Sequence, residues 1–229
     1  MEVLCTNGLK TVLIELLPAF ERARQDKVTV TWGSANGLLK ELEGGAGADI
    51  AILTAEAIDA LIKQGKAAPG SRLDIASSGI ALAMRKGATK PDISSSEALK
   101  RALLAAKTVA HSKTGTSGIY FPTVLAKLGI SEQMQSKIVN PEPGTPVGVL
   151  IARGEAEIGV QQMSELLPVA GIEIIGVLPS SLQKVTTFSA AILRAAKKTD
   201  AARALLEFIA TESPRLLAAN GLEPPTLQV

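Results

Sequence analysis

Apolar positions along the first third of the chain follow two periods, short runs typical of strands and longer stretches typical of amphipathic helices. The predicted strands cover residues 2–6, 28–32 and 49–53, and the helices that follow them cover residues 9–23, 36–43 and 55–64. Leu13 and Leu17 lie on the apolar stripe of the first helix, so this helix is expected to pack against a sheet. The alternation of strands and helices predicts an α/β fold.

A second series of strands and helices begins after Ser77-Ser78-Gly79. Its predicted elements are strands over 80–84 and 108–111, helices over 97–106 and 117–128, apolar segments over 148–153, 157–160 and 172–178, and then a strand over 185–193 and helices over 201–211 and 213–220. No linker rich in Gly, Pro or Ser separates the two series. This absence favours one lobe inserted into the other over two tandem domains.

We therefore predict two lobes, each with a central, mostly parallel sheet flanked by helices. Lobe 1 comprises residues 1–79 and 188–229, and lobe 2 comprises residues 80–187. Two crossover strands join the lobes, and the ligand cleft is expected between them.

Composition narrows the classes of function. With 229 residues, of which 46% are hydrophobic, the chain can bury a large core without disulfides. The 24 basic and 22 acidic residues show no stripe of Lys or Arg, which argues against nucleic acid as a partner. The single Cys5 and single His111 provide no Cys/His cluster for a metal, and no cofactor is expected.

Targeting signals and nucleotide motifs are also missing from the sequence. No apolar run reaches the roughly 20 residues of a membrane helix, so no membrane segment is expected. The chain opens directly into a strand without a signal peptide, which leaves two alternatives: the protein is cytoplasmic, or Met1 replaces a removed leader and the protein is periplasmic. Neither of the glycine-rich nucleotide-binding patterns occurs, which disfavours nucleotides.

Three strand ends are followed by small polar or glycine residues that open a helix. The candidate ligand-binding residues in these turns are Asn7, Gly8, Ser34, Ala35, Asn36, Ser112, Thr116, Ser117 and Gly118. Helix N-termini have unpaired N–H groups and a partial positive charge, so several of them together bind an anion without a formal cation. The alternative for Ser34 and Ser117 is that each is an ordinary N-cap.

Two further strand ends carry candidate residues. Gln161 and Gln162 end an apolar strand, and their amides either bind a ligand or satisfy local backbone groups. His111 ends another strand directly before a glycine-rich turn, where it either has a structural role or accepts a proton as a catalytic base.

The order of these turns resembles the periplasmic molybdate-binding protein family, which are type II solute-binding proteins of ABC transporters. The resemblance covers nearly the whole chain. It rests on Asn7-Gly8-Leu9, Trp32-Gly33-Ser34-Ala35, Gly47-Ala48-Asp49-Ile50, Ser117-Gly118-Ile119-Tyr120 and Gly154-Glu155-Ala156-Glu157-Ile158-Gly159. It implies a periplasmic-binding-protein type II fold and, if the protein is exported, an ABC transporter permease as partner.

The oxyanion positions of that family differ in this chain. Gly8 and Ala35 stand where the family has serine, Ser117 and Gly144 match amide positions, and Gln162 stands at the tyrosine position. The stretch from Pro146 to Pro168 is similar to a divergent branch that includes aconitate isomerase. The resemblance thus implies a small organic di- or tricarboxylate as ligand. Two alternatives remain open: isomerisation of an unsaturated carboxylate, with His111 as the base, and binding of molybdate or tungstate.

Overall fold

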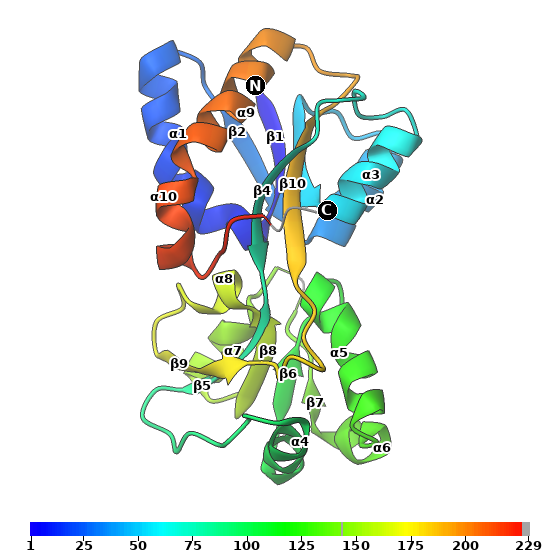
Figure 1. The fold of residues 1–229 in the computed structure, drawn as a ribbon, viewed down its shortest axis with the longest axis vertical. Coiled ribbons are helices and arrows are strands. Elements are labelled where there is room, and N and C mark those ends of the chain that lie inside the picture. Colours follow the sequence, from blue (N-terminus) through cyan, green and yellow to red (C-terminus); the bar gives the residue numbers. More distant parts are fainter. Residues whose placement is uncertain (143, 226–229) are drawn as a thin grey trace. The chain divides into compact units, whose positions relative to one another are not determined.

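The computed structural model describes residues 1–142 and 144–225. The chain divides into two compact units (Figure 1). Unit 1 contains Met1–Ser78 and the described residues from Thr186 onward, and unit 2 is Gly79–Val185. Each unit contains a five-stranded sheet with helices on both faces, which confirms the predicted α/β fold.

The sheet of unit 1 has the strand order β2-β1-β3-β10-β4. Its strands are β1 (Glu2–Thr6), β2 (Thr29–Gly33), β3 (Ile50–Thr54), β4 (Leu73–Ser78) and β10 (Thr186–Ile192). β1 is parallel to β2 and β3, whereas β10 is antiparallel to both β3 and β4. Four of the five strands therefore run in one direction, and the sheet is mixed.

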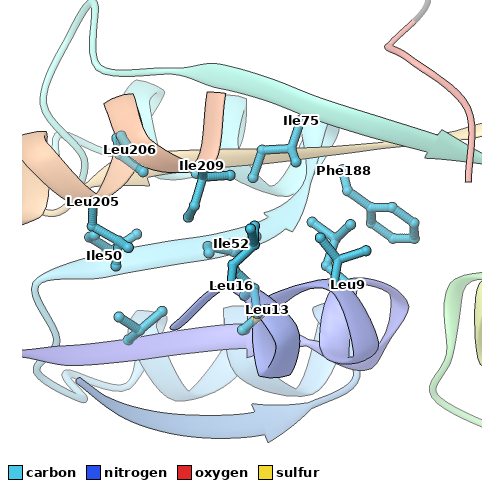
Figure 2. Packing of buried hydrophobic residues seen from close by; sticks show 14 of the residues in the cluster. Leu9, Leu13, Leu16, Ile50, Ile52, Ile75, Phe188, Leu205, Leu206 and Ile209 are labelled. Atoms are coloured by element: carbon cyan, nitrogen blue, oxygen red, sulfur yellow. The ribbon is translucent and has the colours of Figure 1, made fainter. Parts of the chain in front are cut away.

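Helices cover both faces of this sheet. Alternate residues of each strand point to opposite faces, so each face has apolar side chains for a helix to pack on. Val3 and Cys5 of β1 point into the larger core, beneath helices α1 (Lys10–Arg24), α9 (Thr199–Glu212) and α10 (Pro214–Leu217). Leu4 points to the other face, beneath α2 (Ala35–Glu43) and α3 (Ala55–Lys63). Figure 2 shows the larger core, where Leu13 and Leu16 of α1 pack toward Ile52.

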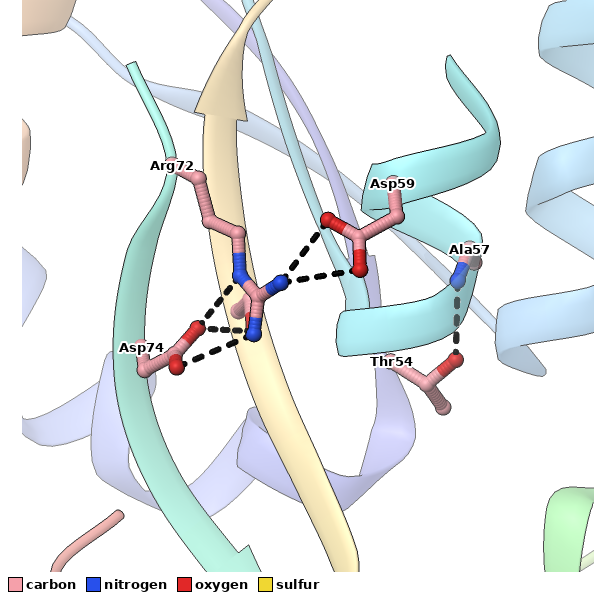
Figure 3. A network of polar contacts seen from close by, with 6 residues as sticks. Thr54, Ala57, Asp59, Arg72 and Asp74 are labelled. Carbon is pink, nitrogen blue, oxygen red and sulfur yellow. Dashed lines mark hydrogen bonds and ion pairs between the residues drawn. The ribbon is translucent and has the colours of Figure 1, made fainter. Parts of the chain in front are cut away.

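A polar network links α3 to the last two strands of the unit 1 sheet (Figure 3). The Arg72 guanidinium donates to both oxygens of Asp59 at 2.8 and 2.9 Å and to both oxygens of Asp74 at 2.8 and 3.0 Å. Ser189 Oγ of β10 donates to Asp74 Oδ1 at 2.6 Å. Burial acts to raise the pKa of Asp74, but these donors outweigh it and the pKa is lowered.

The amino ends of β1 and β3 are held by the buried carboxylate of Asp49. It accepts backbone N–H groups from Glu2 at 2.8 Å, Lys197 at 2.7 Å and Lys198 at 3.0 Å. Burial opposes ionisation of Asp49, but these three donors hold its pKa below the ordinary value. Helix α9 therefore begins, at Thr199, beside the amino edge of the sheet.

The sheet of unit 2 has the order β7-β6-β8-β5-β9 and the same mixed pattern. Its strands are β5 (Ile80–Arg85), β6 (Val109–His111), β7 (Ile138–Val139), β8 (Ile158–Gln162) and β9 (Ile172–Val177). Its helices are α4 (Ser96–Ala105), α5 (Thr116–Lys127) and α6 (Ser131–Met134) on one face, and α7 (Val147–Arg153) and α8 (Met163–Leu166) on the other. β5 is antiparallel to β8, which is parallel to β6.

Short 3₁₀ turns complete the elements. They are η1 (Asn7–Leu9), η2 (Gln135–Lys137) and η3 (Ala218–Asn220). The apolar pattern does not predict β4, β7, α6 or α8. Among the residues described, no helix is long and apolar enough to cross a membrane.

Candidate functional site

The strand ends predicted to carry the site share one edge of each sheet, which we call the carboxyl edge. In unit 1, Thr6 at the end of β1 lies beside Gly33 at the end of β2, and β3 ends at Thr54 on the same side. In unit 2, His111 at the end of β6 lies beside Val160 of β8. Helices that follow parallel strands begin at this edge, which is where open α/β sheets bind ligands.

The chain also passes between the units at these edges. In unit 1 it leaves at Ser78 and returns at Thr186, and these two residues pair with each other just beyond the Thr54 end of β3. In unit 2 it enters at Ile80, which pairs with Gln162 at the end of β8. Each unit thus has its connections to the other unit on the edge that carries its predicted ligand-binding residues.

In unit 1 the structure brings together the predicted residues of the first two turns. Asn7 and Gly8 lie in η1, directly after β1, while Ala35 and Asn36 begin α2, directly after β2. Ser34 is the N-cap of α2, and its Oγ accepts a hydrogen bond from Gly37 N at 3.1 Å. For Ser34, the N-cap alternative is therefore confirmed.

A third helix begins at the same edge, and the sequence analysis missed it as part of the site. Thr54 ends β3 and caps α3, because its Oγ1 accepts a hydrogen bond from Ala57 N at 3.3 Å. A threonine directly before a helix is an ordinary N-cap signal, so Thr54 was recognisable from the sequence.

Gly8 has no room for a side chain. A Cβ atom at this position would lie 2.3 Å from Cζ of Phe188, a buried ring of β10. This aromatic ring, labelled in Figure 2, fills the space that a serine hydroxyl at position 8 would need. At position 8, only the backbone is available to a ligand.

In unit 2 a tight turn joins β6 to α5. Ser112 Oγ accepts a hydrogen bond from Gly115 N at 2.8 Å, and Gly115 is the N-cap residue of α5. Thr116 and Ser117 are thus the first two residues of the helix, and the N-cap alternative for Ser117 is wrong. Gly118 packs so closely on this turn that a Cβ there would lie 1.8 Å from the Ser112 carbonyl oxygen.

His111 is buried on the α5 face of the sheet, with its ring 5.4 Å from that of Phe121. Its Nδ1 donates to the Ser112 carbonyl oxygen at 3.0 Å, because a carbonyl can only accept. Loss of hydration lowers the pKa of His111, and hydrogen bonds with the backbone of Ser112 and Gly118 oppose this shift. Burial therefore favours the neutral imidazole, in which Nδ1 carries a proton when it donates to Ser112. Its catalytic role stays a prediction.

The two glutamines at the end of β8 point to opposite faces of the sheet. Gln161 Oε1 accepts a hydrogen bond from Val147 N at the start of α7, at 3.2 Å, and Gln161 Nε2 donates to Glu165 Oε2 at 2.7 Å. Gln162 is buried and has protein contacts of its own. Gly144, with φ of 84°, lies in the connection that leads to α7.

Glu165 is the residue of this edge that the sequence analysis did not single out. Burial raises its pKa to about 7, while the hydrogen bond from Gln161 acts in the opposite direction. Next to it, Ser164 Oγ is buried and has no hydrogen-bond partner among the described residues.

The case for a ligand site elsewhere on the described surface is weaker than at these edges. Within the described part of the chain, no group of three His, Cys, Asp or Glu residues is placed to hold a metal ion. A hollow of about 370 Å³ lies at the end of α1 and is lined by Pro18, Glu21, Arg22, Gln25, Asp26 and Lys27. These residues precede β2, at the amino edge of the unit 1 sheet. The predicted ligand-binding residues all lie elsewhere.

Comparison with known proteins identifies a matching family and similar sequences. The family described as bacterial extracellular solute-binding protein matches residues 1–223. The chain is 35% identical over 235 residues to a Pseudomonas sp. protein named aconitate isomerase, covering 100% of this chain and 89% of the relative. It is 26% identical over 202 residues to the molybdate-binding protein ModA of Azotobacter vinelandii, covering 85% of this chain and 78% of ModA.

Comparison with solved structures supports the same fold. The periplasmic molybdate-binding protein of Azotobacter vinelandii superimposes with a TM-score of 0.82 at 20% identity, covering 99% of this chain and 100% of that chain. A sulfate-binding protein from Mycobacterium tuberculosis gives a TM-score of 0.77 at 16% identity, covering 98% and 86%. These likenesses confirm the predicted two-lobed fold.

Proposed function

Because the chain belongs to the family of bacterial extracellular solute-binding proteins, we propose that it captures a small anion, an organic di- or tricarboxylate, at the carboxyl edges of its two sheets. The observation that carries this proposal is the set of helices that begin there. α2 and α3 begin at the carboxyl edge of unit 1, and α5 begins at that of unit 2. Their first-turn N–H groups supply hydrogen-bond donors and a partial positive charge.

An anion bound at these edges would use N–H donors of the helices that begin there. Thr116, Ser117 and Gly118 form the first turn of α5, and Ser34 and Asn36 lie at the start of α2. Replacing the hydration shell of an anion by fixed N–H groups requires several donors that are already oriented, which a capped helix start provides.

The chemistry of positions 8 and 162 favours a carboxylate over molybdate. Phe188 excludes a hydroxyl from position 8, and Gln162 provides a neutral amide where the molybdate-binding family has a tyrosine. Ala35 lacks a hydroxyl as well. A site with few hydroxyl donors and several amides suits planar carboxylates, whose oxygens accept paired N–H groups. Similarity to a protein named aconitate isomerase points to the same class of ligand.

The proposal is tested by a thermal-shift screen of the purified protein, because a ligand that binds only the folded state raises the melting temperature. The screen includes cis- and trans-aconitate, citrate, molybdate, tungstate and sulfate. We expect the carboxylates to stabilise the protein. Stabilisation by molybdate or tungstate alone would contradict the proposed ligand class.

A charge placed at the start of α5 tests where the anion binds. Thr116→Asp puts a carboxylate at the first residue of α5, where it favours the helix but repels an anionic ligand. We expect affinity for trans-aconitate to fall by about tenfold or more, with an unchanged or higher melting temperature of the free protein. The matched control is Thr199→Asp, the same change at the first residue of α9, beside the amino edge of the unit 1 sheet. Equal affinities of the two variants would rule out the start of α5 as part of the site.

Isomerisation of an unsaturated carboxylate is the second candidate function, favoured by the relative named aconitate isomerase. In this case a base removes an allylic proton from the substrate and the helix starts stabilise the resulting charge. His111 is the predicted base, because burial lowers its pKa and so favours the neutral imidazole, which can accept a proton.

NMR of trans-aconitate incubated with the protein tests this activity directly. His111→Asn keeps a donor near the Ser112 carbonyl oxygen but removes the base, so turnover is expected to fall by at least about a hundredfold while trans-aconitate still binds. If trans-aconitate binds but is not converted, the protein is a binding protein without isomerase activity.

Delivery of the ligand follows from the family. Since the family is extracellular, we propose that the protein works outside the cytoplasmic membrane and passes its ligand to the permease of an ABC transporter.

A further inference from the structure

A carboxyl group lies at the carboxyl edge of unit 2, where the proposed function requires an anion to bind. Glu165 is the third residue of α8, which follows β8 without a connecting loop. The parallel strand β6 ends at the same edge, followed by the start of α5. A carboxylate in such a place opposes anion binding unless its charge is removed.

The contacts of Glu165 orient its carboxyl group. Gln161 bridges two groups, because its Oε1 accepts from Val147 N while its Nε2 donates to Glu165 Oε2 at 2.7 Å. The bond to Val147 fixes which end of the amide faces Glu165. Within residues 1–142 and 144–225, Glu165 Oε1 has no hydrogen-bond partner. Glu165 is intermediate in exposure rather than fully buried.

The neighbouring elements supply no cation that would keep Glu165 ionised. α8 packs against β5, β8 and α7. β8 has no charged residue. Arg85 of β5 lies next to the pair of Met84 and Ile158, at the opposite end of the sheet, and Arg153 is the last residue of α7 whereas Val147 is the first. Consistent with this arrangement, burial raises the pKa of Glu165 to about 7.

We propose that Glu165 is a ligand-binding residue whose protonated carboxyl group donates a hydrogen bond to a carboxylate of the ligand, so that capture of the anion takes up a proton. The inference rests on the proposed function and adds one donor to it. A hydrogen bond between an acid and a carboxylate is charge-assisted and stronger than one between neutral groups. The neutral acid also avoids the repulsion that two adjacent carboxylates would cause.

Proton uptake on binding determines how ligand affinity changes with pH. Below pH 7 Glu165 already carries its proton, and affinity is independent of pH as long as the ligand stays ionised. Above pH 7 the free protein has lost the proton and must recover it on binding, so affinity falls by up to about tenfold per pH unit.

Isothermal titration of trans-aconitate between pH 6.5 and pH 9 tests the inference, in two buffers with different ionisation enthalpies at each pH. For the unaltered protein we expect the fall in affinity above about pH 7 and an uptake of close to one proton per ligand at high pH. Glu165→Gln mimics the protonated acid: its amide donates to the ligand while its carbonyl still accepts from Gln161 Nε2. This variant is expected to bind equally well across the range, without proton uptake. Glu155→Gln, an exposed change in the same unit, is the control and should keep the full pH dependence.

Three results would overturn the inference. Binding that is independent of pH in the unaltered protein, or pH dependence that persists in Glu165→Gln, removes Glu165 from the site but leaves the proposed function intact. Failure of trans-aconitate to bind at any pH removes both the proposed tricarboxylate ligand and this inference.

Discussion

Replacing Gly118 by alanine is expected to abolish ligand capture and to destabilise unit 2 by more than about 4 kcal/mol. The added Cβ would lie 1.8 Å from the Ser112 carbonyl oxygen and 2.7 Å from its carbonyl carbon, far inside van der Waals contact. These are backbone atoms, so no rotation of a side chain relieves the overlap. Ser112 is also held by the hydrogen bonds to its Oγ from Gly115 N and to its carbonyl oxygen from His111.

Denaturant unfolding and trans-aconitate titration of Gly118→Ala measure both effects. Gly47→Ala is the control, because a Cβ at Gly47 meets no atom within 4 Å and its backbone does not adopt a positive φ. We expect the control to change the free energy of unfolding by less than about 1 kcal/mol. A Gly118→Ala protein as stable as the control would mean that the turn between β6 and α5 is not packed as described.

The elements with a simple apolar period could be predicted from the sequence, whereas those stabilised by tertiary contacts could not. The first strand was predicted at its observed bounds, and both ends of α1 were predicted to within one residue. β4 was missed as a sheet strand because Asp74, Ser77 and Ser78 interrupt its apolar pattern. Asp74 is accommodated there by Arg72 and Ser189, and Ser189 lies 115 residues away in the sequence.

The candidate site could likewise be predicted only in part from the sequence. The turns that open helices after parallel strands were recognisable from their glycine and hydroxyl residues, but their capping geometry was not. The N-cap residue of α5 is Gly115 rather than Ser117, and its N–H donates to Ser112 Oγ in a turn that Gly118 packs against closely. Glu165 has no local signal, because its raised pKa depends on packing between α8 and the sheet.

The contact between Gly8 and Phe188 leads to a second prediction, that Gly8→Ser destabilises unit 1 by about 3 kcal/mol and adds no affinity for molybdate. The new Cβ would lie 2.3, 2.7 and 2.9 Å from the Cζ, Cε1 and Cε2 atoms of Phe188. This ring is buried in the larger core of unit 1, so it has little freedom to move away.

A double-mutant cycle isolates this contact. Phe188→Leu removes the outer ring atoms, so serine at position 8 should cost at least about 1.5 kcal/mol less in the leucine background than beside phenylalanine. Gly47→Ser controls for the intrinsic effect of serine in place of glycine, since that position is open. Denaturant unfolding gives the four free energies, and a thermal-shift assay with molybdate shows whether the double variant, with space for the hydroxyl, gains affinity for a tetrahedral oxyanion. If Gly8→Ser costs no more than Gly47→Ser, Phe188 does not exclude a hydroxyl from the site, and the preference for carboxylates must have another cause.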